Sequence, residues 1–486
     1  MFSALKTRKW PELVTAFFLV VGVLLRLRQF SCGRSMGLDE ARLALHIINA
    51  SFQTLFLPFD NSFAPPGFLF LEKSVGVWFG YGENVLRLVP LLSGIGALFL
   101  FYRVALLLIS RRAIPLAVAF FALCPMMIDY ASVLKQYSTD VLVSLMALLL
   151  VRRMQDGAWT RSRAYVYGFC GALMIWCSVT AVFILSGSMI IECVHGVVRK
   201  ERDRAASLIV IGSVWILAGV WLWSLCLRAH PNQDHFIDFW REYFIPEIGR
   251  ISWFARTLQD FFSRVVGLGW MWIGGAVAFL SGCVGLAITC SRRLAHLLAP
   301  LLLLLAAAAL DYYPLTGRYL LFILPVVLMV MAEGVFFFQG RGWGRLAGVM
   351  VAAALLVVPV GQSAALMKAP IRKEEIKGAI QYWKTNRLPE DNIYLYFWSV
   401  PAFQYYEPEE FRSERCLVGG WFKDIPDRAF LRSDLARFPG KKRVWVLFSH
   451  SSKSEEAAFL KELNLMGKQL RAFKTQGASV YLYDFP

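Results

Sequence analysis

The sequence predicts a mostly α-helical, polytopic membrane protein with a small α/β domain after its last membrane span. Of its 486 residues, 57% are hydrophobic and only 17% are charged, which is too apolar a composition for a soluble globular protein. Long apolar runs alternate with short polar segments as far as residue 360, and from about residue 369 the charges return and the long runs end. The parts of the chain before and after about residue 365 therefore belong to different structural classes.

The apolar runs predict about eleven transmembrane helices, each close to the length that a bilayer requires. The predicted spans are 11–25, 84–108, 114–130, 140–151, 164–178, 180–197, 206–227, 265–290, 294–310, 319–338 and 346–360. Lys6, Arg8 and Lys9 precede the first run, and no small-x-small cleavage site follows it. An uncleaved first helix is therefore expected rather than a signal peptide.

The basic residues indicate the orientation of these helices. The formal net charge is +17, but the positive residues form small clusters between apolar runs, which is typical of cytoplasmic loops and not of a nucleic-acid-binding face. The clusters are Arg111-Arg112, Arg152-Arg153, Arg199-Lys200, Arg292-Arg293 and Arg341 with Arg345. All lie on the side of the N-terminus, which predicts a cytoplasmic N-terminus, an extracytoplasmic C-terminal domain and no nucleic-acid partner.

The first external loop, about residues 30–83, is too long to be a simple connector. It contains the adjacent carboxylates Asp39 and Glu40, followed by apolar residues near helical spacing over 41–52. This pattern predicts an amphipathic helix at the membrane interface. Asp39 is a candidate functional acid, and the alternative is that it caps this helix. The prolines at 65 and 66 stop any helix, and 68–79 is too short to span comfortably.

The predicted domains are a transmembrane domain over 1–363 and an extracytoplasmic α/β domain over 364–486. Helix-like and strand-like segments alternate in the second domain. The expected helices are 371–386, 427–438 and 454–465, and the expected strands are 392–397, 443–448 and 479–483. This part contains no glycine-rich phosphate loop and no obvious metal cluster, so we expect an accessory or acceptor-facing domain.

Ionisable and tyrosine side chains near the external ends of the spans are candidate functional residues, because charges are costly at this depth. They are Asp39, Glu40, Glu72, Lys73, Asp129, Lys135, Tyr137, Asp140, Asp311, Tyr312, Tyr313, Arg318 and Tyr319. Structural alternatives exist for several of them. Lys135 and Arg318 could be snorkelling anchors, Glu72 and Lys73 a solvated pair at a helix end, and Asp140 a first-turn helix acid.

Five motifs in this order resemble a known family. They are the Asp39-Glu40 pair and the segments 64–73 (APPGFLFLEK), 84–90 (NVLRLVP), 130–140 (YASVLKQYSTD) and 313–319 (YPLTGRY). Together they resemble the polytopic, lipid-sugar-dependent glycosyltransferases of the GT-C type, which include protein O-mannosyltransferases, lipid A aminoarabinose transferases and rhizobial core-lipopolysaccharide transferases. The resemblance covers residues 1–340.

The resemblance implies a role for each matching residue. Asp39, beside Glu40, would be the general base that deprotonates an acceptor hydroxyl in an inverting transfer. Lys135 and Arg318 would hold the donor phosphate, with Tyr137, Tyr319 and Lys73 as further substrate-binding residues. The family often has an acid, a candidate metal ligand, where this chain has Val133, so the sequence leaves open whether a divalent metal ion takes part.

The resemblance also implies the partners, namely a polyprenyl-phosphate sugar donor, a lipid, glycan or protein acceptor, and membrane lipids. The chemistry is consistent with the residues themselves, because fixed cations stabilise a phosphate leaving group and one carboxylate activates a hydroxyl. Two other functions stay open on the sequence alone. One is a transporter or flippase of lipid-linked sugars, and the other is a non-catalytic envelope assembly subunit.

The predicted topology can be tested with single cysteines in the intact chain. We expect Ser454→Cys, but not Ser110→Cys, to react with a membrane-impermeant thiol reagent added from the extracytoplasmic side, because the two positions lie on opposite sides of the bilayer. Labelling is read by mass spectrometry against the unsubstituted protein, whose own cysteines set the background. Labelling of Ser110→Cys alone would reverse the predicted orientation.

Overall fold

The computed structural model of the chain contains two compact units. It describes residues 2–57, 64–157, 159–227, 240–246, 251–337, 343–420, 433–434, 436–437 and 442–486. The first unit comprises Met1–Ser31 and Ala50–Pro370, and the second comprises Cys32–Asn49 and Ile371–Pro486. The segment Cys32–Asn49, which the sequence analysis assigned to the first external loop, thus groups with the C-terminal part of the chain.

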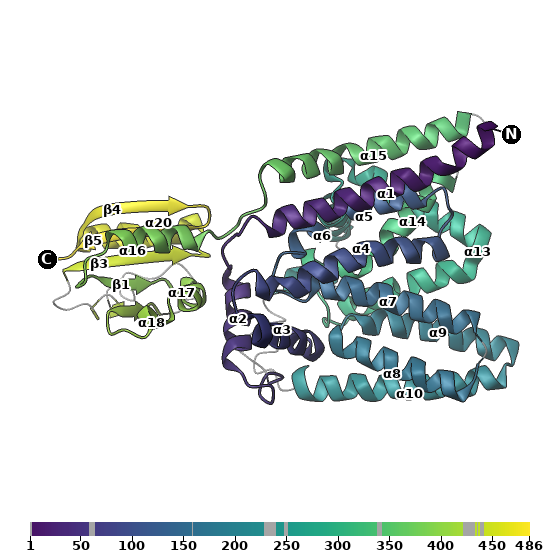
Figure 1. Ribbon diagram of the computed structural model, residues 1–486, viewed down its shortest axis with the longest axis horizontal. Coiled ribbons are helices and arrows are strands. Elements are labelled where there is room, and N and C mark those ends of the chain that lie inside the picture. The colour runs from purple at the N-terminus through teal and green to yellow at the C-terminus, as the bar shows by residue number, and fades with distance from the viewer. Residues whose placement is uncertain are drawn as a thin grey trace. The chain divides into compact units, whose positions relative to one another are not determined.

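The first unit is a bundle of helices (Figure 1). Its α-helices are α1 (Phe2–Phe30), α3 (Pro66–Phe79), α4 (Leu88–Leu108), α5 (Ile114–Leu123), α6 (Pro125–Tyr130), α7 (Tyr137–Asp156), α8 (Arg161–Cys177), α9 (Ala181–Arg199), α10 (Arg202–Leu222), α12 (Ile251–Asp260), α13 (Trp272–Ala309), α14 (Leu324–Phe337) and α15 (Trp343–Lys368). The 3-10 helix η6 (Gly317–Ile323) leads into α14. In this bundle α1 packs against α5, α4 against α7, and α13 against α14.

Seven helices in the described residues are long and apolar enough to cross a membrane. The difference from the predicted eleven has simple causes. Two predicted spans lie in α13, where Cys290, at φ −160° and ψ 77°, separates two helices. Three others correspond to α5 with α6, α7 and α8, which are short or carry charges at their ends. The predicted fold class, a polytopic helical membrane protein with a small C-terminal α/β domain, is confirmed.

A buried arginine in α1 compensates for a proline that interrupts the neighbouring helix. Pro125 has no N–H group, so the carbonyl of Phe121 lacks its usual helical partner where α5 gives way to α6. The guanidinium of Arg26 donates to the carbonyls of Ala122 and Phe121, at 3.4 and 3.5 Å, and to Gly22 in its own helix at 2.9 Å. The break between α5 and α6 is therefore stabilised by a charge from α1.

Two glycines let α13 and α14 approach closely. A Cβ at Gly282 would lie 1.9 Å from the carbonyl oxygen of Val330, and one at Gly334 would lie 1.8 Å from that of Ala278. No side chain fits either space, so both positions require glycine at this backbone separation. Small residues of this kind are typical of helix contacts in membranes, where close packing replaces the hydrophobic effect.

The second unit is built on a five-stranded sheet with strand order β2-β1-β3-β5-β4. Its strands are β1 (Asn392–Leu395), β2 (Cys416–Val418), β3 (Arg443–Ser449), β4 (Lys468–Thr475) and β5 (Ala478–Asp484). β1 is parallel to β2 and β3, whereas β5 is antiparallel to β3 and β4. Its helices are α2 (Leu38–Asn49), α16 (Ile376–Asn386), α17 (Val400–Tyr406), α18 (Pro408–Phe411) and α20 (Lys453–Met466).

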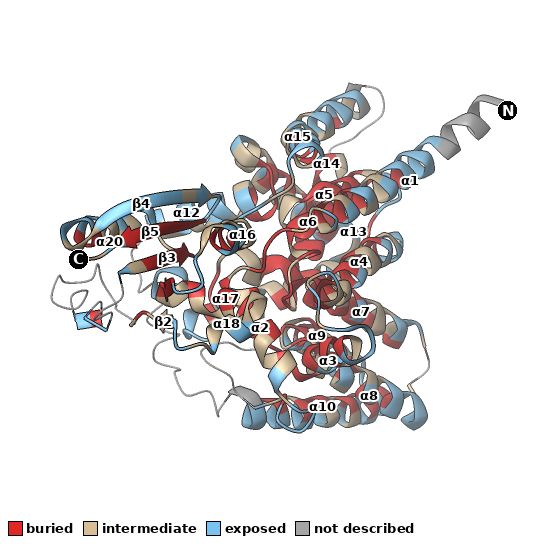
Figure 2. Cartoon of the chain, turned by 60° about the vertical axis from the view of Figure 1, so that its left-hand side comes forward, coloured by how far each residue is buried: buried red, intermediate tan, exposed pale blue. Residues whose placement is uncertain are grey.

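The sheet is covered on both faces. Alternate residues of its central strands, among them Tyr394, Val446 and Tyr481, form one core with Phe459 of α20. On the other face the ring of Tyr382 from α16 lies 6.2 Å from that of Trp445. Figure 2 shows β3 and β5 as buried and β4 as exposed.

The predicted strands correspond to β1, β3 and β5, and two of the predicted helices to α16 and α20. β2 and β4 were not predicted, because β2 has only three residues and β4 is a charged and exposed edge strand without an apolar pattern. The helix predicted over 427–438 falls largely outside the described residues.

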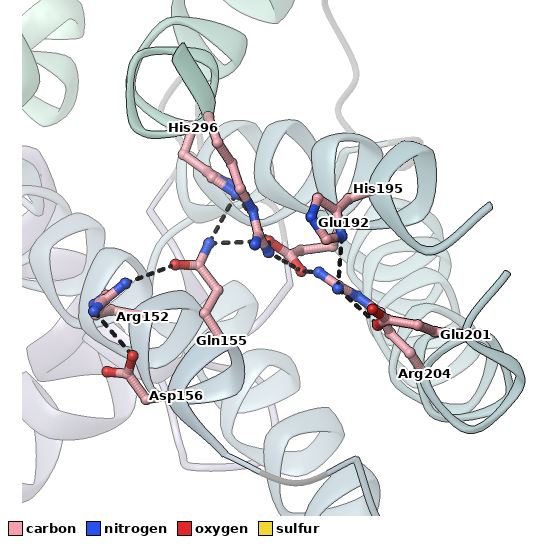
Figure 3. A network of polar contacts seen from close by, with 9 residues as sticks. Arg152, Gln155, Asp156, Glu192, His195, Glu201, Arg204 and His296 are labelled. Carbon is pink, nitrogen blue, oxygen red and sulfur yellow. Dashed lines mark hydrogen bonds and ion pairs between the residues drawn. The ribbon is translucent and has the colours of Figure 1, made fainter. Parts of the chain in front are cut away.

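One buried carboxylate joins four helices of the first unit (Figure 3). Glu192 of α9 is 1% exposed, and its oxygens accept from Gln155 of α7 at 2.9 Å and from Arg292 of α13 at 2.9 and 3.1 Å. Two further partners complete the set. Arg204 of α10 forms an ion pair with Glu192, and the Nε2 of His296 lies 2.8 Å from it. A single charge therefore links α7, α9, α10 and α13.

We expect Glu192→Ala to destabilise the protein by about 3–5 kcal/mol, because it leaves buried cations without their counter-charge. The measurement is thermal unfolding of the purified full-length protein in detergent. Asp260→Ala is the control, since Asp260 pairs with Arg264 at 3.5 Å with both side chains exposed and should change stability by less than about 1 kcal/mol. An equal effect of both substitutions would contradict a special role for Glu192.

Candidate functional site

Three of the predicted site residues come together in the first unit. Arg318 lies in η6, which packs against α7. Its guanidinium carbon is 5.6 Å from the ring centroid of Tyr137 and 5.8 Å from that of Tyr319. The two rings meet edge to face with centroids 6.1 Å apart. A guanidinium that stacks on aromatic faces is oriented by them, and its planar set of N–H donors matches the geometry of anionic oxygens.

Three more rings pack against Tyr137 and Tyr319. Tyr130 lies 5.1 Å from Tyr137, and Trp240 lies 5.1 Å from Tyr319. Tyr313 lies 6.0 Å from Tyr319, and its hydroxyl donates to the Tyr319 carbonyl at 2.9 Å. We call Tyr130, Tyr137, Trp240, Tyr313 and Tyr319 the aromatic cluster. It combines apolar surface with one rigid cation, which suits a ligand that has both a phosphate and a hydrocarbon chain.

Lys135 stands two residues before Tyr137, in the turn that leads into α7. Its side chain is buried, at 7% exposure, and its backbone N–H donates to the carbonyl of Val133 at 2.7 Å. A snorkelling anchor would extend its ammonium group outward, whereas this side chain lies within the protein. The anchor alternative is therefore not supported for Lys135, and a buried lysine of this kind is a functional candidate.

Lys73 and Glu72 lie on α3 and are both buried, at 7% and 0% exposure. The ammonium of Lys73 is 5.2 Å from the ring centroid of Tyr81. Neither carboxylate oxygen of Glu72 has a hydrogen-bond partner among the described residues. The alternative of a solvated pair at a helix end is wrong, because α3 buries this turn against its neighbours. Asp140 lies in the first turn of α7, as the alternative of a first-turn helix acid expected.

Asp39 and Glu40 belong to the second unit, in the first turn of α2. Asp39 is the second residue of this helix, so the alternative that it is the N-cap is wrong. The capping acceptor comes from elsewhere in the unit, since the Leu38 N–H donates to the Oε2 of Glu374 at 2.8 Å. The residues just before the helix are held similarly. The Met36 N–H donates to the hydroxyl of Tyr406 at 2.7 Å, and the Ser35 N–H donates to Glu375 at 3.3 Å.

The amphipathic helix predicted over 41–52 is present, but its bounds and its surroundings differ from the prediction. α2 begins at Leu38 and ends at Asn49, and it packs against α17. Leu43, Ala44 and Ile47 are fully buried. The prediction of a helix whose apolar face lies on the lipid surface is therefore wrong, because protein side chains already cover that face.

A titratable side chain at the end of β3 interacts electrostatically with Asp39. His450 directly follows this strand with a left-handed backbone, φ 56°, a conformation that costs energy in a non-glycine residue. Its Nδ1 lies 2.8 Å from the Oε1 of Glu374. The Glu374 hydrogen bond raises the pKa of His450 above its usual value, and the negative charge of Asp39 raises it further. Glu374 thus joins the imidazole to the N-terminus of α2.

Sequence reasoning missed Glu374, His450 and Trp398. The ring of Trp398 lies 5.3 Å from the guanidinium carbon of Arg42 in α2. Glu374 is one of many charged residues in its segment, and nothing in its spacing relates it to Leu38, 336 positions away. The available signal for His450 was its position two residues after a predicted strand. Among the described residues, no group of three or more His, Cys, Asp or Glu side chains could hold a metal ion.

Comparisons with known proteins show what fold this chain has. No family model and no curated protein matches it. Among solved structures, ArnT from Cupriavidus metallidurans in the apo state is similar over 98% of both chains, with a TM-score of 0.60 and 14% identity. ArnT bound to undecaprenyl phosphate is similar over 97% of this chain and 98% of that one, with a TM-score of 0.59 and 14% identity.

A second kind of enzyme is also similar. The oligosaccharyltransferase AglB from Archaeoglobus fulgidus, in complex with an inhibitory peptide and a dolichol-phosphate, has a TM-score of 0.54 and 13% identity over 98% of this chain and 74% of that one. Structural similarity at identities this low establishes the fold alone, and the resemblance expected from the motifs is confirmed at that level. This chain has the fold of the GT-C type membrane glycosyltransferases.

Proposed function

We propose that this protein is an integral membrane glycosyltransferase that moves a sugar from a polyprenyl-phosphate donor to an acceptor hydroxyl. The observation that carries the proposal is the guanidinium of Arg318 held between Tyr137 and Tyr319, with the buried Lys135 in the same turn as Tyr137. Fixed cations beside aromatic and apolar surface suit a phosphate attached to an isoprenoid chain.

The bound ligands of the similar structures support this donor class. ArnT was solved with undecaprenyl phosphate and AglB with a dolichol-phosphate. Both ligands are isoprenoid phosphates, which reach a membrane enzyme by lateral diffusion. We extend this donor class to the present chain, which contains no nucleotide-binding fingerprint in its sequence.

The mechanism that we propose assigns one role to each group. The carboxylate of Asp39 takes the proton from the acceptor hydroxyl, whose oxygen attacks the anomeric carbon on the face opposite to the phosphate. The bond from that carbon to the phosphate oxygen breaks, so the configuration inverts. Lys135 and Arg318 stabilise the negative charge on the departing lipid phosphate, and Lys73 adds a further cation. A negative charge on the neighbouring Glu40 would make the Asp39 carboxylate a stronger proton acceptor.

The reaction is placed on the extracytoplasmic face. This proposal rests on the arginine and lysine clusters that flank the apolar runs on the side of the N-terminus, and it also makes the second domain extracytoplasmic. A test of the overall activity uses purified protein in lipid nanodiscs with radiolabelled polyprenyl-phosphate sugars and envelope lipid, glycan or peptide acceptors. Transfer of label supports the proposal. Movement of intact lipid-linked sugar across vesicles without transfer would instead indicate a flippase.

We expect Arg318→Ala and Lys135→Ala to weaken donor binding about 10- to 150-fold each, because a charge-assisted hydrogen bond contributes about 1.5–3 kcal/mol. Tyr137→Phe should bind normally, since the ring face is kept. The measurement is the Kd of a polyprenyl phosphate for protein in nanodiscs. Arg387→Ala is the matched control, because Arg387 also lies over a ring, 4.3 Å from that of Trp383, in the second unit. Unchanged donor Kd in both variants would remove these cations from the site.

We expect Asp39→Asn to lower kcat by about 10²- to 10⁴-fold with normal expression and donor binding, because asparagine cannot accept the proton. Asp203→Asn provides the control, since Asp203 is also a first-turn helix acid, in α10. Asp39→Asn keeps the size of the side chain, so loss of folding should not accompany the loss of turnover. Near-normal turnover of Asp39→Asn would exclude Asp39 as the base.

A further inference from the structure

The second unit has the geometry of a ligand-binding sheet. The strands lie in the order β2-β1-β3-β5-β4, so β1 is followed in the chain by β2 at one edge of the sheet, whereas the adjacent β3 is followed by β4 at the other edge. In open α/β sheets, ligands bind outside the carboxyl ends of the strands at such a switch point. Trp398 and His450 follow the carboxyl ends of β1 and β3, respectively. The carboxyl edge of the parallel strands is therefore the expected binding position in the second unit.

The segment held at this edge is the start of α2. Arg42 lies over the ring of Trp398, and His450 reaches α2 through Glu374, which accepts the Leu38 N–H. A Cβ at Gly37 would lie 3.1 Å from the Oε2 of Glu374, so the backbone approaches this carboxylate closely. The unit therefore binds a segment of its own chain in the position that many sheets of this kind use for a ligand.

The contacts converge on the residues next to Asp39. Three of the four residues from Ser35 to Leu38 donate their N–H groups to side chains in the C-terminal part of the unit. A further link is the ammonium of Lys377, which donates to the carbonyl of Gly33 at 2.7 Å. Amides at a helix N-terminus need such acceptors, because the first turn offers none of its own. Loss of an acceptor would loosen the turn that carries Asp39.

We infer that Glu374 is a positioning residue, which fixes the first turn of α2 and thereby the direction in which Asp39 presents its carboxylate, with Tyr406 and His450 as supporting groups. This inference rests on the proposed role of Asp39 as the base. Glu374 itself touches neither donor nor acceptor in this scheme. Its effect is on turnover, because a misplaced base slows proton transfer while the donor phosphate is held by other residues.

The test compares Glu374→Ala with Glu374→Gln in the full-length protein. Glutamine keeps an oxygen that can accept the Leu38 N–H, whereas alanine does not. We expect Glu374→Ala to lower kcat about 10- to 100-fold with unchanged donor Kd, and to raise hydrogen exchange of the amides at Met36 and Leu38 about tenfold or more. Glu374→Gln should restore most of both properties.

Glu410→Ala is the matched control, because it removes a carboxylate of the same unit whose ion pair, with Arg387 at 2.6 Å, does not involve α2. Tyr406→Phe is a second probe that keeps the ring and removes the hydroxyl that accepts the Met36 N–H, so the test survives if Glu374→Ala does not fold. The inference would be overturned if Glu374→Ala and Tyr406→Phe both kept the wild-type kcat and the wild-type hydrogen exchange at Met36 and Leu38. It would also be overturned if Glu410→Ala changed kcat and exchange as much as Glu374→Ala does. The exchange measurement does not depend on activity, so it separates this inference from the role of Asp39.

Discussion

The bundle must satisfy its charges and free carbonyls with its own side chains, because lipid offers no hydrogen-bond partners. Arg26 meets this requirement at the break that Pro125 makes between α5 and α6. Glu192 meets it where α7, α9, α10 and α13 converge, with donors from all three neighbouring helices. Interactions of this kind define which helices are neighbours, since hydrophobicity alone does not distinguish one apolar helix from another.

The same constraint makes the candidate donor site recognisable. Arg318 and Lys135 are charges in a part of the chain where charge is costly, so their presence calls for a compensating function. The aromatic cluster supplies that compensation for Arg318 through ring faces, which attract a cation without neutralising it. A guanidinium of this kind stays positive and oriented, as stabilisation of a phosphate leaving group requires.

The second unit is more than the accessory domain that its composition indicated. It includes Cys32–Asn49, and so it contains the Asp39-Glu40 pair around which the functional hypothesis was built. Glu374 accepts from the N-terminus of α2 and joins it to His450, at the carboxyl edge of the parallel strands. The domain therefore bears directly on the proposed chemistry through the helix that it holds.

The sequence by itself determined the membrane class, most of the spans, the strands β1, β3 and β5, and the candidates Tyr137, Arg318 and Tyr319, because hydropathy, strand periodicity and charge in apolar surroundings are local signals. Only the tertiary structure decided that α2 packs against α17, that Glu374 rather than Asp39 caps it, and that Glu192 collects its partners from three other helices. Leu38 and Glu374, for example, are 336 positions apart in the chain. No local pattern encodes such a contact, since it exists only once the intervening chain has folded.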